Sequence, residues 1–449
     1  MRPRLGIAIL AAAALLAPSA LRASELEAYS STSLYIQKQW RDGSAYAVTP
    51  LYEFVSLSGR GIEIPGGELA VVVDAWGGVN LASGDWWNGY WNTGRWSGDL
   101  NLAFVKASWL QNDLQVRLGR MNVGAGNARM LQLDGGAVNA RFLRHVTLEA
   151  WAGAPTPQRF VGWGSVYTSN PTFGDIAAGG RLGFAFGHWI NLGLSTTVAW
   201  SSGDLSREDV AVDLKISPAS WMYFLGYLDY SLLARDYFEG FGSQIPEASA
   251  SLVFPVTRHL QFTADYVYTV PSLMLASQSI LWVFSDGTNQ YLGASARVGL
   301  EQFGAGLPLT FDVGYRRVFE EWSLFTNGQV SGDRVSLRAT WKPTKASAVG
   351  AEGAWLDPTE QGYWYGRVFG SMTAAGFTGT LDGQGYWFAQ DVNGHSSSLV
   401  ASASLGYDLG QGLSVVGAVS GGATPYYKDF FSGMVKLVYN QTYRSREVR

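Results

Sequence analysis

The chain has 449 residues and a formal net charge of −4, and it contains 55 glycines but no cysteine. Charged residues make up 15 % of the chain, whereas an ordinary soluble domain has about 25 %. Without cysteine there are no disulfide scaffolds or thiolate metal sites, and the hydrophobic content of 47 % excludes intrinsic disorder. The slightly negative charge offers no basic field for nucleic acid, so we expect no nucleic-acid partner.

The N-terminus predicts an export signal rather than a folded segment. Two arginines precede an apolar stretch from Gly6 to Leu16, and small residues follow as far as Ala23. Basic residues, a short apolar run and small residues, in this order, are typical of a cleaved secretory signal peptide. We therefore expect residues 1–23 to be removed and the remaining chain to be exported.

After this segment, the chain repeats stretches of roughly a dozen residues in which apolar and polar residues alternate. In chain order, the clearest apolar faces are those of residues 210–216, 260–268, 292–300, 309–315 and 335–341. A period of two predicts β-strands, and strands of this length are long enough to cross a bilayer at a tilt. No run of about 20 apolar residues follows the signal, so the sequence predicts no transmembrane helix.

Breaks between these stretches alternate between short and long. Short breaks include residues 111–113, 187–188 and 410–412, and long ones include residues 82–96, 155–174 and 271–289. This alternation is typical of outer-membrane barrels, which have short periplasmic turns and long outer loops. We predict an all-β fold, a single transmembrane antiparallel β-barrel over residues 24–444, with about 22 strands (range roughly 16–22). Residues 445–449 are predicted to be a periplasmic tail.

In these features the sequence resembles the porin-like outer-membrane β-barrels of Gram-negative bacteria. The resemblance covers nearly the whole mature chain and implies an outer-membrane location, a lipid bilayer around the barrel and a water-filled passage through it. One feature departs from the family pattern: such barrels usually end on an aromatic residue, whereas Tyr443 is followed by six non-aromatic residues. The alternative architecture is a soluble exported β-protein, but the chain shows no repeat of about 40 residues that would indicate a propeller.

A second, local resemblance concerns the stretch that begins at Arg117. Arg117-Leu-Gly-Arg120 is followed by a glycine loop, by Arg129 and by Asp134-Gly-Gly. This stretch is similar to a pattern in alginate-export barrels and implies passage of a polysaccharide. Read from the residues alone, it is also compatible with an ordinary strand–loop–strand that carries a structural Arg–Asp pair. The hypothesis is a pore-mouth loop formed by Arg117, Arg120, Arg129 and Asp134.

Catalytic and metal-binding patterns are missing from the sequence. The four histidines stand apart, and none has a second histidine or a carboxylate at metal-ligand spacing. The glycines at positions 124 and 126 precede no Lys-Ser/Thr pair, so they do not form a phosphate-binding loop. We therefore expect no enzyme activity, no metal and no cofactor.

Basic residues gather on the predicted inward face of three consecutive stretches. They are Arg297, Arg316, Arg334 and Arg338. Two interpretations remain open. The arginines pair with acids such as Glu301 and Asp312 and keep the lumen wet and rigid, or they form a basic wall that selects anions, as charged rings do in wide pores.

The most aromatic segment lies in a predicted outer loop. Its aromatic residues are Trp86, Trp87, Tyr90, Trp91 and Trp96, interleaved with Asn, Gly and Arg. They can stack on sugar rings, belong to an interfacial girdle, or form part of a constriction. Residues 363–365 and 386–388 are predicted girdles because they lie at strand ends.

These observations predict an outer-membrane barrel that forms an aqueous passage for hydrophilic, anionic or sugar-containing substrates. Export of a polysaccharide, together with a periplasmic or inner-membrane partner, is one form of this function. A general diffusion porin and a non-conducting barrel used for assembly or adhesion are the alternatives.

Overall fold

The computed structural model describes residues 25–41, 44–82, 96–124, 131–142, 144–156, 175–201, 203–232, 245–270, 288–303, 307–323, 328–358, 362–425 and 429–444. Its strands are β1 (Glu25–Arg41), β2 (Ser44–Val48), β3 (Pro50–Ile64), β4 (Gly67–Asn80), β5 (Trp96–Trp109), β6 (Leu114–Val123), β7 (Leu131–Phe142), β8 (Val146–Pro155), β9 (Ile176–Phe186), β10 (Ile190–Ser201), β11 (Asp204–Ala219), β12 (Met222–Ser231), β13 (Glu247–Thr257), β14 (Leu260–Thr269), β15 (Asn289–Gly299), β16 (Leu309–Ser323), β17 (Gly328–Thr344), β18 (Ser347–Pro358), β19 (Tyr363–Ala374), β20 (Phe377–Val392), β21 (His395–Gly410), β22 (Leu413–Ala423) and β23 (Phe430–Arg444). Two short 3₁₀ helices, η1 (Leu110–Asn112) and η2 (Leu300–Phe303), complete the described elements. In this part of the chain, no helix is long and apolar enough to span a membrane.

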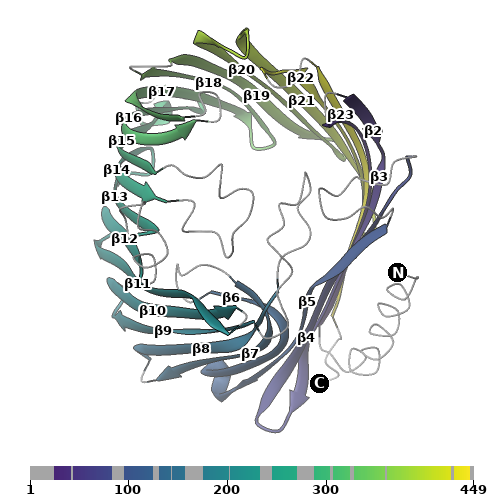
Figure 1. Cartoon of the computed structure of the whole chain (residues 1–449), viewed down its shortest axis with the longest axis vertical. Coiled ribbons are helices and arrows are strands. Elements are labelled where there is room, and N and C mark those ends of the chain that lie inside the picture. The colour runs from purple at the N-terminus through teal and green to yellow at the C-terminus, as the bar shows by residue number, and fades with distance from the viewer. Residues whose placement is uncertain are drawn as a thin grey trace.

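The strands join edge to edge in one closed sheet (Figure 1). From β3 onward each strand pairs antiparallel with the next, and β23 returns to β1, where Glu25 lies opposite Arg444. β2 and β3 are separated only by Thr49 and both pair with β1, so they form one interrupted strand of the wall. The described residues therefore form a ring of 22 strands, which confirms the predicted barrel.

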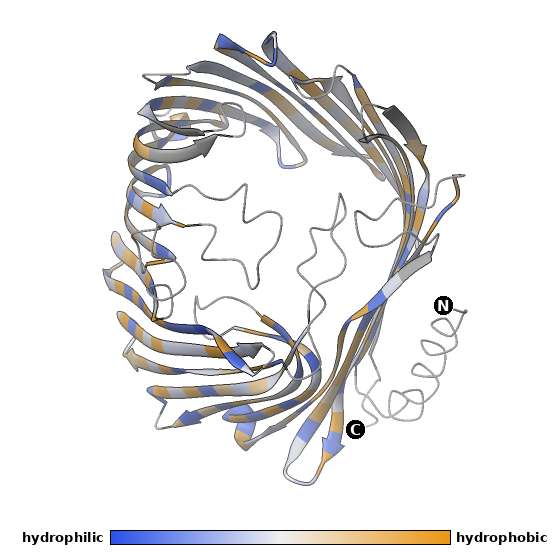
Figure 2. Ribbon diagram, in the orientation of Figure 1, coloured by the Kyte–Doolittle hydropathy of each residue, from blue (hydrophilic) through white to orange (hydrophobic). Residues whose placement is uncertain are grey.

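Hydrophobic and hydrophilic residues alternate along many of the strands (Figure 2), and successive side chains of a strand point to opposite faces of the wall. On β23, Phe431, Val435 and Leu437 point outward and are 44–57 % exposed. Ser432 and Lys436 lie between them and point inward. Because directly paired residues share a face, the register carries this assignment around the whole ring. The exposed aliphatic and aromatic side chains lie mainly on the outward face, as a bilayer requires.

Tight turns gather at the end of the barrel where β1 begins and β23 ends. The turn between β21 and β22 shows why glycine is needed there: Gly412 has a φ of +79°, and a Cβ built on it would stand 1.9 Å from the carbonyl oxygen of Asn440. The stretches around Gly77, Asp134 and Gly379, which alternate weakly in sequence, lie within β4, β7 and β20. The predicted signal segment and the predicted tail lie outside the described residues.

Two clusters of buried apolar side chains lie on the inward face. One contains Met121 and Leu133, both 0 % exposed, with Trp151 beside them. The other contains Tyr52 and Trp76, whose ring centroids are 6.2 Å apart. The inner surface of the barrel is therefore partly packed and only partly polar.

The outward and inward positions of β23 respond differently to a charge. We expect Val435→Arg to lower the free energy of unfolding in lipid vesicles by about 2–4 kcal/mol, because an arginine near the middle of the lipid-facing wall must leave water. The neighbouring change Met434→Arg points inward and should cost much less. Urea titrations of both variants followed by tryptophan fluorescence test this, and equal losses would contradict the assigned faces.

Candidate functional site

The four arginines predicted to form a basic wall do share one face of three consecutive strands. Cross-strand pairing places Arg297 of β15 opposite Asp312 of β16, and Asp312 opposite Arg338 of β17. Four residues closer to the outer ends of β16 and β17, Arg316 lies directly opposite Arg334. The face is the inward one, because the alternate residues Val313, Val335 and Leu337 of β16 and β17 are 44–50 % exposed on the outside.

Only one of these four arginines forms an ion pair with a carboxylate in the described part of the chain. The Arg297 Nε donates to Asp312 Oδ1 at 2.6 Å. Arg316 instead lies over the ring of Tyr291, with its Cζ 4.6 Å from the centroid. Arg338 lies over the ring of Phe369 at the same distance. Such contacts hold a guanidinium in place while its charge remains available to a solute.

Arg316 and Arg334 form the most basic point of the wall. Side chains directly opposite each other on antiparallel strands have Cβ atoms about 4.5–5.5 Å apart, and like charges at this spacing destabilise the sheet. Neither guanidinium forms an ion pair within the described residues, and the carboxylate nearest in the row, Asp265 of β14, lies on the far side of Gly293 from Arg316. An anion placed between the two guanidinium groups would relieve this repulsion.

The basic wall extends further than sequence reasoning proposed. Glu352 of β18 and Arg367 of β19 continue the row beyond Arg338, since each is paired in register with its neighbour. Arg367 forms an ion pair with Asp382 of β20, with its Nε 2.8 Å from Asp382 Oδ2. The sequence signal for Arg367 was its position, because it lies two residues from both Tyr365 and Phe369 and therefore shares their face of β19.

Aromatic rings line the wall beside these arginines. The centroid of the Tyr386 ring lies 5.7 Å from that of Tyr363 and 5.0 Å from that of Tyr365. In the two predicted girdles only the central tryptophans, Trp364 and Trp387, point outward, where they are 61 % and 53 % exposed. The flanking tyrosines point inward because residues alternate along a strand.

The predicted pore-mouth set is only partly brought together. Arg120 forms a two-bond ion pair with Asp134, at 2.7 and 2.8 Å. Its third nitrogen donates to Asp99 at 3.2 Å and to the carbonyl of Leu100 at 2.9 Å. This cluster shares the outward face with Leu118, near the outer ends of β5, β6 and β7.

Arg117 lies apart from that cluster. It points inward, on the opposite face of β6, and donates to the carbonyl of Asn122 at 3.4 Å. Arg129 lies outside the described residues, as do Trp86, Trp87, Tyr90 and Trp91 of the aromatic loop. Trp96 is the first residue of β5, and its side chain is not among those described.

A second inward ion pair crosses a glycine. Arg181 of β9 reaches over Gly193 of β10 to Asp213 of β11, with nitrogen–oxygen distances of 2.9 and 2.7 Å. Its side chain is only 18 % exposed and that of Asp213 is 21 % exposed. A Cβ at Gly193 would stand 2.0 Å from Asp213 Oδ2 and 2.4 Å from Arg181 Nη2. The glycine is therefore what allows the pair to form.

Metal-binding geometry is missing from the described part of the chain, where no group of three or more His, Asp or Glu side chains is placed to hold an ion. His145, His188 and His259 lie in tight turns, as predicted.

A comparison with known protein families found no family model that matches the chain, and a comparison with curated proteins found no match. Among solved structures, the translocation pore of the P pilus usher PapC is similar at 9 % identity and a TM-score of 0.47, over 92 % of this chain and 99 % of that one. Acinetobacter baumannii OccAB4 has 11 % identity and a TM-score of 0.43, over 93 % and 98 %. Pseudomonas aeruginosa OpdK, solved with vanillate, has 14 % identity and a TM-score of 0.42, over 93 % and 98 %.

The ion pair of Arg120 should stabilise the outer ends of β5, β6 and β7. We expect Arg120→Ala to lower the free energy of unfolding by about 1–3 kcal/mol, because it removes the two-bond partner of Asp134 and one of the partners of Asp99. Arg120→Lys should restore little of this, since lysine cannot bind two carboxylates with a planar fork. Arg141→Ala, which breaks an exposed pair 3.8 Å long, is the matched control and should cost under about 0.5 kcal/mol. Urea titration measures all three, and full rescue by lysine would contradict the expectation.

Gly193→Ala should destabilise the barrel by separating Arg181 from Asp213. We expect a loss of about 1–3 kcal/mol, close to that of Asp213→Asn, and a double variant that costs no more than either single change. Gly383→Ala is the control, since no heavy atom lies within 4 Å of a Cβ at that position. Additive losses in the double variant would mean that the glycine acts independently of the pair.

Proposed function

We propose that this chain is an outer-membrane barrel that provides an aqueous passage and favours anionic solutes. The observation that carries the proposal is the inward pair Arg316–Arg334, set in a closed ring of 22 strands whose outward face is apolar. The predicted signal over residues 1–23 supports delivery across the inner membrane. The end with tight turns and both described termini then faces the periplasm.

Selection in such a passage is electrostatic. The inward face of β15 to β20 includes five arginines and three acids, namely Arg297, Arg316, Arg334, Arg338, Arg367, Asp312, Glu352 and Asp382. Excess positive charge along a water-filled wall raises the local concentration of anions, and added salt screens this effect over about 8–10 Å.

Export of an anionic polysaccharide is the finer form of this proposal. The tyrosines beside Arg334 support it, because Tyr363, Tyr365 and Tyr386 present ring faces on which sugar rings can stack, next to guanidinium groups that bind carboxylates. In this form the barrel works with a periplasmic or inner-membrane partner. A general diffusion porin needs the basic wall but not the rings.

Single-channel recording in planar bilayers tests the passage and its selectivity. We expect the double change Arg316→Gln/Arg334→Gln to lower the anion-to-cation permeability ratio by roughly twofold or more, because charged rings set the selectivity of wide pores. The control is Arg317→Gln, which removes one positive charge from the residue next to Arg316 on the outward face, where Arg317 pairs with Asp333 at 3.1 Å.

Each result has a defined meaning. Block by polyanionic oligosaccharides, but not by neutral ones, that weakens in Arg316→Gln/Arg334→Gln supports the export conduit. Large conductance without polyanion block favours the diffusion porin. If the barrel inserts but the bilayer shows no conductance, the proposed passage is overturned and a barrel used for assembly or adhesion is favoured.

A further inference from the structure

A carboxylate lies on the outward face of the barrel, where β1 meets β3. Glu53 is directly opposite Thr32 in the register. The Ser30 hydroxyl donates to Glu53 Oε1 at 2.6 Å, and the Thr32 hydroxyl donates to Oε2. This face is outward because Ile36, which lies on the same face of β1 as Thr32, is 54 % exposed. Tyr52, the residue before Glu53, points to the opposite face and belongs to the inward aromatic cluster.

The charge of Glu53 is solvated only by hydroxyl groups. In the described part of the chain, the side chains bonded to it are those of Ser30 and Thr32, and it forms no ion pair. Charged residues on the lipid-facing surface of a barrel cost free energy that grows with depth. A cationic group from outside the chain that binds Glu53 would offset this cost.

Measured along β23, the register places Glu53 close to the periplasmic rim of the apolar band, whereas on β3 itself Val55 and Leu57 continue the same face toward the periplasm. Along the outward face of β23, the apolar residues end at Leu437, and Tyr439 and Gln441 follow, bonded to each other. Leu437 lies opposite Thr32, and Tyr439 lies opposite Ser30. Tyrosine side chains mark the level of lipid headgroups in membrane proteins. On the side that faces β23, Glu53 therefore lies one rung inside that level, within reach of a headgroup.

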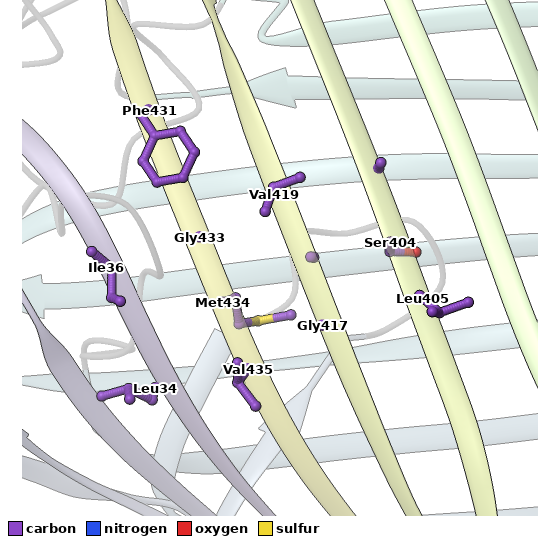
Figure 3. A pocket seen from close by; sticks show the side chains of 12 residues that line it. Leu34, Ile36, Ser404, Leu405, Gly417, Val419, Phe431, Gly433, Met434 and Val435 are labelled. Atoms are coloured by element: carbon purple, nitrogen blue, oxygen red, sulfur yellow. The ribbon is translucent and has the colours of Figure 1, made fainter.

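An apolar groove begins beside this carboxylate, at Leu34 of β1, and Figure 3 shows the side chains that line it. It has a volume of about 500 Å³ and is lined mainly by Leu34, Ile36, Gly417, Phe431, Gly433 and Val435. The two glycines form its floor: a Cβ at Gly417 would meet no heavy atom within 4 Å, and at Gly433 the nearest atom lies 3.8 Å away. Leu34 and Ile36 follow Thr32 along the same face of β1. The groove therefore continues from the polar cluster toward the end of the barrel that lies away from the periplasm.

We propose that this outward face binds one phospholipid with a primary-ammonium headgroup, such as phosphatidylethanolamine. The ammonium group donates hydrogen bonds to Glu53, and an acyl chain lies in the groove over Gly417 and Gly433. A second copy of this chain fits less well, because a two-fold contact centred on this face would bring two Glu53 carboxylates together. The inference rests on the membrane placement proposed above but not on conduction.

Native mass spectrometry of the barrel released from vesicles tests the proposal. The vesicles contain equal amounts of phosphatidylethanolamine, phosphatidylcholine and phosphatidylglycerol with identical acyl chains. We expect the wild-type chain to retain one phosphatidylethanolamine in preference to the others. Glu53→Gln should lower this retention by about tenfold, the size expected for the loss of one charge-assisted hydrogen bond. Gly417→Leu should lower the retention of all three lipids, because it fills the groove.

Gly383→Leu is the matched control, because Gly383 is another outward glycine with open space around it, outside the groove. It should leave the lipid pattern unchanged. Equal retention of the three headgroups by the wild type, or unchanged retention by Glu53→Gln, would overturn the proposal. A dimer that Gly417→Leu dissociates would also overturn it, in favour of a protein contact. Flotation of the vesicles distinguishes failure of the lipid site from failure of the membrane placement. A chain that does not float with the vesicles has not inserted, and this result overturns the membrane placement as well.

Discussion

Backbone hydrogen bonding is the constraint on which the rest of this structure depends. A strand inside a bilayer finds no water for its amide and carbonyl groups, so each must be paired with a neighbouring strand. The pairing of β1 with β23 leaves the ring without an open edge. Closure also fixes the faces: a slip of one residue would exchange inward and outward side chains along a whole strand. The positions of Arg316, Glu53 and the groove all follow from that register.

The sequence was sufficient to predict the fold. Alternation alone placed Arg297, Arg316, Arg334 and Arg338 on one side of three neighbouring strands, since it is a local property of each strand. The partners of these arginines could not be predicted, because they depend on how strands are shifted against each other. Arg367 reaches Asp382 diagonally, and Arg181 reaches Asp213 across an intervening strand.

Aromatic and charged clusters were harder to interpret, because a cluster in sequence is divided between two faces in a strand. Residues 363–365 were predicted as one girdle, but Trp364 points to lipid and its two neighbours point to the lumen. Arg117 and Arg120 were grouped in one hypothesis, although they lie on opposite faces of β6 in a regular register. In both cases, whether two residues are separated by an even or an odd number of positions predicts better whether they share a face.

The seam between β1 and β23 has a consequence for how the barrel forms. Most strands that pair are also neighbours in sequence, but these two are separated by nearly the whole described chain. The entropic cost of closing so long a loop grows only slowly with length, yet contacts this remote in sequence form late. Until they form, β1 and β23 each present an unpaired edge to any other strand. The last step of folding is therefore the one that protects the chain from wrong partners.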